Sequence, residues 1–297
     1  MRVNPNPVPD LISNFETMQQ QSNTDLAQIS SGESINVPSD DPAGAALLVQ
    51  NSAATSQADQ FLRSIGNVQG EMQDADSALS SVATILQQAI SLGTEGANGT
   101  LNDADRNAVA VEVQGIQSQL LSLANLSYQG KYVFAGTATG TTPYVLDDTN
   151  PAGVSYKGNG ETNSVTLGNG FAMQTNLPGS SLFSSQNNNV FQGIQDLISN
   201  LYVGNTTGIG NAVTEISSAY NYMNSQRTFY GNAIDQLTSQ QTYLNSETTQ
   251  LAQQQNTIGG ADLPKDITNL ETTQVSEQAT LEAIAQTQQN NLFSYLK

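Results

Sequence analysis

Adjacent carboxylates are the side chains in this sequence that come closest to a chemical site. Asp40 and Asp41 could act as an acid–base pair or hold a metal ion, because two neighbouring carboxylates can share a proton or a cation. Pro42 follows directly, and Asp followed by Pro is an ordinary helix start, with Asp as the N-cap and Pro at the first helical position. We therefore predict that Asp41 and Pro42 cap a helix.

Two other acidic stretches resemble fragments of a calcium-binding loop. Residues 103–105 (Asp-Ala-Asp) and 147–148 (Asp-Asp) lack the further oxygen ligands and the terminal Glu of an EF-hand. The glycine-rich stretch 136–140 lacks the Lys of a phosphate-binding loop. We interpret all three as loops and turns, and we predict no metal and no cofactor.

The residue types that most enzymes use are missing. The chain has 0 Cys, 0 His and 0 Trp, which excludes disulfides, thiol nucleophiles and imidazole bases. Arg227 lies within a long apolar repeat, where we interpret it as a register or interface residue. The aromatic segment 132–134 could be a ligand platform, but aromatic residues at a strand start more often anchor a small core. We predict that the protein is not an enzyme.

Composition and charge limit the classes of partner that the chain can bind. The chain has 297 residues, with 8 basic and 26 acidic side chains, and its net charge of -18 would repel nucleic acid and anionic membranes. We therefore expect no nucleic-acid and no membrane partner. The N-terminus has no apolar stretch of signal-peptide length, so we expect a cytosolic chain or one exported by another route.

Long apolar repeats define the expected fold. Apolar or small side chains recur in alternating steps of four and three from Leu47 to Ala89, with one lapse at Asn51, which is typical of a coiled-coil seam. The same rhythm runs over 109–123 and 209–258, and a shorter helix is expected over 190–201. The sequence predicts a mainly α fold, in which the N- and C-terminal halves form a long antiparallel coiled-coil-like helical bundle.

A β-rich insertion interrupts the helices. Short β-prone runs separated by Gly, Asn, Thr and Pro occupy the middle of the chain, and we expect a separately folded head there. The expected strands are 132–134, 144–146, 154–156 and 165–167. The predicted division is an N-terminal assembly segment at 1–40, helical rod at 41–131, a β-rich inserted domain at 132–186, helical rod at 187–258 and a C-terminal assembly helix at 259–297.

The two ends carry sparse apolar stripes. Each end buries too little apolar surface alone to offset the entropy of ordering, so we expect these segments to fold only against each other or against neighbouring subunits. The exposed apolar chain end needs a partner to cover it. The predicted assembly interface is Leu11, Phe15, Met18, Leu281 and Ile284, and the predicted partner contact is Leu292, Phe293, Tyr295 and Leu296.

Several motifs in order resemble the flagellin family of bacterial flagellar axial proteins, and within it the hook–filament junction subunits. The resemblance spans nearly the whole chain. Its motifs are 31–43 (SGESINVPSDDPA), 98–106 (NGTLNDADR), 120–125 (LLSLAN), 132–136 (YVFAG), 156–158 (YKG), 178–183, Arg227 with Gly231, and 292–296 (LFSYL).

This resemblance implies a structural junction subunit that self-associates in a helical ring. Its implied neighbours are hook-associated protein 1 and flagellin, and its implied partner before export is a flagellar export chaperone. The implied location is the extracellular flagellum, reached through the flagellar type III apparatus without a cleaved signal peptide. Two alternatives stay open: a flagellin filament subunit, and a secreted coiled-coil effector or adhesin.

Overall fold

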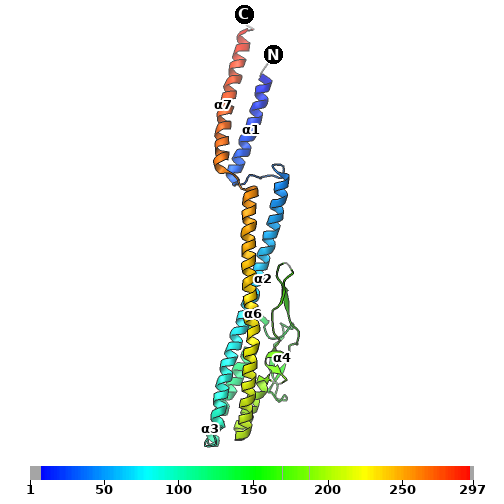
Figure 1. Ribbon diagram of the computed structural model, residues 1–297, viewed down its shortest axis with the longest axis vertical. Coiled ribbons are helices and arrows are strands. Elements are labelled where there is room, and N and C mark those ends of the chain that lie inside the picture. Colours follow the sequence, from blue (N-terminus) through cyan, green and yellow to red (C-terminus); the bar gives the residue numbers. More distant parts are fainter. Residues whose placement is uncertain (1–7, 169, 187, 295–297) are drawn as a thin grey trace. The chain divides into compact units, whose positions relative to one another are not determined.

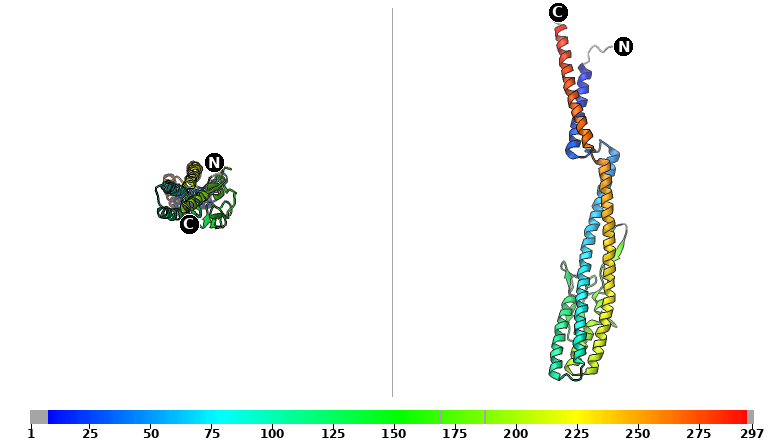
Figure 2. Two further views of the ribbon diagram at one scale, coloured as in Figure 1. Left: turned by 90° about the horizontal axis from the view of Figure 1, so that it is seen from below. Right: turned by 60° about the vertical axis from the view of Figure 1, so that its left-hand side comes forward.

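The computed structural model describes residues 8–168, 170–186 and 188–294, with side chains as far as residue 287 (Figures 1 and 2). The chain divides into two compact units. Unit 1 comprises residues 1–58 and 246–297, and unit 2 comprises residues 59–245.

Helices account for most of the described chain. They are α1 (Val8–Ser31), α2 (Pro42–Gly96), α3 (Asp103–Ala124), α4 (Gly179–Leu182), α5 (Val190–Tyr202), α6 (Thr206–Gly259) and α7 (Leu263–Ser294). Four two-stranded antiparallel sheets lie between α3 and α5 in the described part of the sequence. Their strands are β1 (Ser127–Tyr128), β2 (Lys131–Tyr132), β3 (Tyr144–Leu146), β4 (Val154–Tyr156), β5 (Ser164–Thr166), β6 (Ala172–Gln174), β7 (Ser184–Ser185) and β8 (Asn188–Asn189).

The long helices of unit 2 bury the predicted seams. On α2, the seam residues from Ile65 through Leu86 include side chains with 0% exposure, and on α6 the same holds for Met223, Tyr230 and Leu237. A glycine lets α2 and α6 approach closely. A Cβ on Gly93 of α2 would lie 2.4 Å from Val213 of α6. The predicted mainly α fold with a coiled-coil-like bundle is confirmed.

In unit 1, the start of α2 differs from the prediction by one residue. Leu47 was expected in the seam but is 49% exposed. Leu48 faces α6 instead. A Cβ added to Gly259 of α6 would lie only 2.9 Å from Leu48 Cδ1, which shows how closely the two residues approach. Asn51 is itself a seam residue, since its Nδ2 donates to Gln254 Oε1 at 3.4 Å. The lapse in the repeat is therefore a polar pair between the two helices.

The β-rich region occupies the predicted place, with β3 and β4 at the predicted residues. The expected strand 132–134 is shorter: β2 ends at Tyr132, and Phe134 is a fully buried turn residue. We predicted a separately folded head, and in the structure this region belongs to unit 2 together with the bundle.

Specific contacts join the β-rich region to the helices of unit 2. Asn125, the C-cap of α3, makes two hydrogen bonds of 2.8 Å with the backbone of Tyr144. The rings of Tyr144 and Phe191 of α5 lie 4.9 Å apart. Tyr230 of α6 accepts a hydrogen bond from the Leu177 N–H at 3.3 Å. These strands therefore form one core with the bundle.

None of the helices among the described residues is both long and apolar enough to cross a membrane.

Candidate assembly interface

Helices α1 and α7 lie side by side in unit 1 (Figure 1). Each helix turns one face inward, where buried and half-buried residues recur in steps of three and four. Met18 and Thr280 touch across this interface, with Sδ and Oγ1 3.8 Å apart. The inward faces comprise Val8, Leu11, Phe15, Met18, Ser22, Asp25 and Ile29 on α1, and Asp266, Leu270, Thr273, Glu277, Thr280, Ile284 and Thr287 on α7.

The interface between α1 and α7 is polar over much of its length. Asp25 is 1% exposed, and its Oδ1 accepts a hydrogen bond from Gln21 Nε2 at 2.9 Å. Among the described residues, Asp25 Oδ2 and Glu277 Oε1 are buried without a hydrogen-bond partner. Buried polar atoms without partners cost free energy, so they offset part of the stabilisation that the apolar contacts of this helix pair provide.

Apolar side chains also lie on the outer faces of this pair. Ile12 and Leu26 on α1 are 45% and 56% exposed. Val275 and Leu281 on α7 are 68% and 50% exposed. Such side chains give the pair a second, uncovered apolar surface.

The structure brings most of the predicted assembly residues together. Leu11, Phe15 and Met18 lie on the inward face of α1, and Ile284 lies on the inward face of α7. Leu281 lies outside that face and is half exposed. For the predicted partner contact, the backbone of Leu292 and Phe293 belongs to α7, whereas their side chains and all of Tyr295 and Leu296 lie outside the described residues.

The adjacent carboxylates at 40–41 both bind backbone amides. Asp41 Oδ1 accepts from the N–H groups of Ala43 and Gly44, each at 3.0 Å, which is the geometry of an N-cap on α2. Asp40 Oδ2 accepts from the N–H groups of Asn36 and Val37, each at 3.0 Å, and closes the preceding loop. Neither carboxylate is arranged for acid–base chemistry.

The side chains of the other acidic stretches also bind residues close to them in the sequence. Asn102 caps α3 through a 2.9 Å bond from the Asp105 N–H, and Asp103 pairs with Arg106 at 3.1 Å. Hydrogen bonds from Ser155 and Thr149 hold the pKa of the Asp147 carboxyl at about 2, well below its ordinary value. Within the part of the chain that the structure describes, no cluster of acidic side chains could hold a metal ion.

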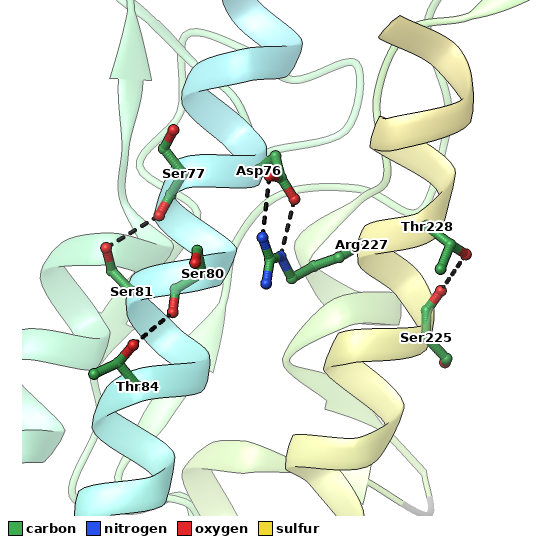
Figure 3. Close-up of polar contacts among 8 residues, drawn as sticks. All are labelled: Asp76, Ser77, Ser80, Ser81, Thr84, Ser225, Arg227 and Thr228. Atoms are coloured by element: carbon green, nitrogen blue, oxygen red, sulfur yellow. Dashed lines mark hydrogen bonds and ion pairs between the residues drawn. The ribbon is translucent and has the colours of Figure 1, made fainter. Parts of the chain in front are cut away.

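A bidentate ion pair links α2 to α6 in unit 2 (Figure 3). Arg227 Nε and Nη2 donate to the two carboxylate oxygens of Asp76, at 2.9 and 3.1 Å. The two side chains are 28% and 33% exposed, so the pair is only partly screened by water. This hydrogen bonding raises the pKa of Arg227 above its ordinary value, mainly through Asp76. An apolar seam tolerates axial sliding, whereas this pair has one geometry, so it sets the register of α2 against α6.

We expect loss of this pair to destabilise unit 2 moderately. Arg227→Ala should reduce the free energy of unfolding by about 1–3 kcal/mol, because it leaves Asp76 without its charged donors. A double-mutant cycle with Asp76→Ala, measured by urea unfolding, should give a coupling energy of at least about 1 kcal/mol. The matched control is Arg63→Ala on the exposed face of α2, expected within about 0.5 kcal/mol of the parent. A coupling energy near zero would contradict the register role.

The half-buried carboxyl of Glu71 on α2 makes stability depend on pH. Burial raises the pKa of Glu71 above its ordinary value, although the charge of Lys131 opposes this. The folded chain therefore holds this proton more tightly than the unfolded chain, so the stabilisation is present at acidic pH and is lost as pH rises through the folded pKa. Glu71→Gln should raise Tm at neutral pH, and the gain should shrink toward about pH 4. Glu112→Gln, at an exposed site on α3, is the control; an equal gain in both variants would argue against burial as the cause.

The helical parts of the sequence match two family descriptions. Residues 10–139 match the bacterial flagellin N-terminal helical region, and residues 213–296 match the bacterial flagellin C-terminal helical region. The chain belongs to the flagellin family. The matched regions include all but the first residues of α1, all of α2 and α3, most of α6, and all of α7. The α1–α7 pair therefore lies in the part of this flagellin-family chain that the family shares.

Two curated relatives are similar to parts of this flagellin-family chain. Flagellar hook-associated protein 3 of Escherichia coli (strain K12) is 38% identical over 118 residues, covering 39% of this chain and 37% of that protein. Flagellin of Listeria monocytogenes is 25% identical over 213 residues, covering 67% of this chain and 72% of that protein. The alignment with hook-associated protein 3 thus spans little more than a third of the length of that relative.

Solved structures of flagellar proteins share this fold. A protein from Vibrio parahaemolyticus described as a flagellar hook-associated protein superposes with a TM-score of 0.69 at 20% identity, covering 74% of this chain and 99% of that chain. The flagellar junction protein FlgL from Legionella pneumophila superposes with a TM-score of 0.61 at 14% identity, covering 72% of this chain and 100% of that chain. At such identities the likeness establishes the fold of this flagellin-family chain.

Proposed function

We propose that this flagellin-family chain is a structural, non-enzymatic junction subunit that connects the hook of the bacterial flagellum to the filament. Three observations support a role at the hook–filament junction. The motifs of the sequence resemble junction subunits, the higher-identity relative is a flagellar hook-associated protein 3, and a flagellar junction protein shares the fold.

The observation that carries the proposal is the α1–α7 pair. Its inward face contains buried carboxylate oxygens that have no partner among the described residues, and its outer faces expose Ile12, Leu26, Val275 and Leu281. A helix pair that is weakly stabilised within one chain and apolar on its outside gains most from packing against further copies. The segments 1–40 and 259–297 therefore act as assembly segments, which become fully ordered in a helical ring of subunits.

The proposal names several partners. In the assembled ring, Leu11, Phe15 and Met18 of α1 lie against the stripe of Leu281 and Ile284 on α7. This pair packs against its equivalents in neighbouring copies of the chain, with hook-associated protein 1 and flagellin as the axial neighbours. Before export, the chaperone covers the apolar end at Leu292, Phe293, Tyr295 and Leu296. The mature location is the extracellular hook–filament junction, reached without a cleaved signal peptide.

A flagellin filament subunit is the second candidate, favoured by the longer alignment with a flagellin. The position of the labelled protein along isolated flagella separates the two. A thin band at the hook–filament boundary is expected for a junction subunit. Label along the whole filament would overturn the junction assignment in favour of the filament subunit, and no label on flagella would overturn both.

Removal of the C-terminal half of α7 should abolish assembly without unfolding unit 2. A chain truncated before Ala279 loses Thr280, Ile284 and Thr287 from the inward face, and none of these belongs to unit 2. We expect a soluble monomer by light scattering, with the main thermal transition unchanged, that fails to support attachment of filaments to the hook. Leu146→Ser, at a 71% exposed site in unit 2, is the control and should support attachment.

Hydrogen exchange on the free full-length chain provides the complementary measurement. We expect the backbone amides of residues 8–31 and 263–287 to exchange much faster than those of the buried seams of unit 2, because opening of a weak helix pair costs little free energy. Equal protection in both regions, or attachment of filaments by the truncated chain, would contradict assembly through coupled folding.

A further inference from the structure

The connection between α2 and α3 is an exposed turn built on an Asn-Gly sequence. Asn98, Gly99 and Thr100 are all exposed, and the Leu101 N–H donates to the Asn98 carbonyl oxygen at 3.1 Å to close the turn. A Cβ added to Gly99 would meet nothing within 4 Å. Neither packing nor burial restricts this side of the turn.

The side-chain amide of Asn98 is held in an activating arrangement. Its Oδ1 accepts hydrogen bonds from both the Thr100 N–H, at 3.1 Å, and the Thr100 hydroxyl, at 3.0 Å. Two donors on one carbonyl oxygen withdraw electrons from Cγ and stabilise negative charge on that oxygen, as in an oxyanion hole. Among the interactions of the described residues, the Gly99 N–H has no acceptor. An electrophilic carbon and an available amide nitrogen are therefore one residue apart.

We propose that Asn98 is a site of spontaneous covalent modification, by deamidation through a cyclic imide. The Gly99 nitrogen loses its proton to solvent base and attacks Asn98 Cγ, forming an N–C bond. The Cγ–Nδ2 bond then breaks, and Nδ2 leaves as ammonia after taking up a proton. Water hydrolyses the five-membered imide at either carbonyl, which gives aspartate or isoaspartate at position 98. The only co-reactant is water.

A second Asn-Gly pair in unit 2 serves as an internal comparison. Asn159 Oδ1 likewise accepts from an N–H two residues on, that of Glu161, at 3.4 Å. Its Oδ1 also accepts from the Thr137 N–H at 2.8 Å, and its Nδ2 donates to Thr137 Oγ1 at 2.6 Å. Asn98 is held only within its own turn, whereas this half-buried side chain is fixed against a different loop, and Thr137 Oγ1 must release the leaving nitrogen before the imide can form. The structure thus distinguishes two sites with the same dipeptide.

The modification adds one negative charge to the turn, and isoaspartate adds a methylene to the main chain. Helix α3 should survive both changes, because its cap at Asn102 uses a hydrogen bond that does not involve the turn. The product is therefore a folded chain with a more acidic end of the bundle.

Site-resolved mass spectrometry of the folded full-length protein, incubated in mildly alkaline buffer, tests the proposal. Deamidation at Asn98 should proceed roughly tenfold or more faster than at Asn159, since only Asn159 is restrained by contacts with a residue of a different loop, Thr137. In concentrated urea the two rates should become similar. Equal rates in the folded protein, or a difference that persists in urea, would overturn the proposal.

Two variants sharpen the test. Gly99→Ala should slow the reaction at Asn98 without changing Tm, because the site has room for a Cβ and Gly99 does not have a positive φ. Thr137→Val, at an exposed residue, should speed the reaction at Asn159 and leave Asn98 unchanged. An unaltered rate at Asn98 in Gly99→Ala would exclude attack by the following amide nitrogen.

Discussion

Replacing Leu237 with Asp is expected to reduce the free energy of unfolding of unit 2 by about 4 kcal/mol or more. Leu237 is 0% exposed in the seam of α6. The substitution forfeits about 2–3 kcal/mol of apolar burial, leaves space in the seam and places a carboxylate at a fully buried position. For a unit of this size, Tm should fall by roughly 10 °C.

Two matched variants isolate the cause of that effect. Asn232→Asp introduces the same carboxylate at an exposed position on α6, and it should change stability by less than about 0.5 kcal/mol. Leu237→Met keeps an apolar side chain of similar volume and should cost less than about 1.5 kcal/mol. If Leu237→Asp melted at the temperature of the parent protein, the seam of α6 would not be part of the core.

Deletion of the β-rich region should have a larger effect than any point substitution. When residues 135–185 are replaced by a short linker, we expect unit 2 to lose its cooperative thermal transition and most of its helical circular dichroism. The deletion removes Tyr144, Leu167, Leu182 and Phe183, each at most 1% exposed. At about 1.5–3 kcal/mol for each side chain, this loss is comparable to the whole stability of a domain.

Helices α5 and α6 would also lose side chains that they pack against. Phe191 of α5 packs against the rings of Tyr144 and Phe183, at centroid distances of 4.9 and 6.3 Å. In the intact protein, Tyr222 of α6 donates to the Ser181 carbonyl oxygen at 3.0 Å, and Tyr230 accepts from the Leu177 N–H. The deletion removes both of these hydrogen bonds. Exposed aromatic side chains in a shortened chain favour aggregation over a folded bundle.

A pair of point variants tests the same conclusion without a deletion. Phe183→Ala, at a buried site, should cost about 3–5 kcal/mol, whereas Leu146→Ala, at a 71% exposed site, should cost little. A deletion variant that retained its helical signal and a sharp transition would restore the view of the β-rich region as a separate head.

Periodicity in the sequence was sufficient to predict the helices. Side chains spaced for one face of a helix are buried together wherever that helix packs, so the repeats over 47–89 and 209–258 located α2 and α6 without knowledge of their partners. Helix caps could also be predicted from the sequence, because Asp41 and Asn102 bind backbone amides only two or three residues away. The sparse stripes at the two ends also indicated that these segments need each other.

What the sequence left open depends on contacts between distant residues. A repeat of steps of four and three does not distinguish Leu47 from Leu48. The structure leaves Leu47 49% exposed and places Leu48 against Gly259 of α6. Nothing local marks Asp76 as the partner of Arg227, 151 positions away. A change from helical to β-prone residues marks where the β-rich region begins, but not whether it shares a core with the helices. Only the rings of Tyr144, Phe183 and Phe191, brought together by the tertiary structure, show that it does.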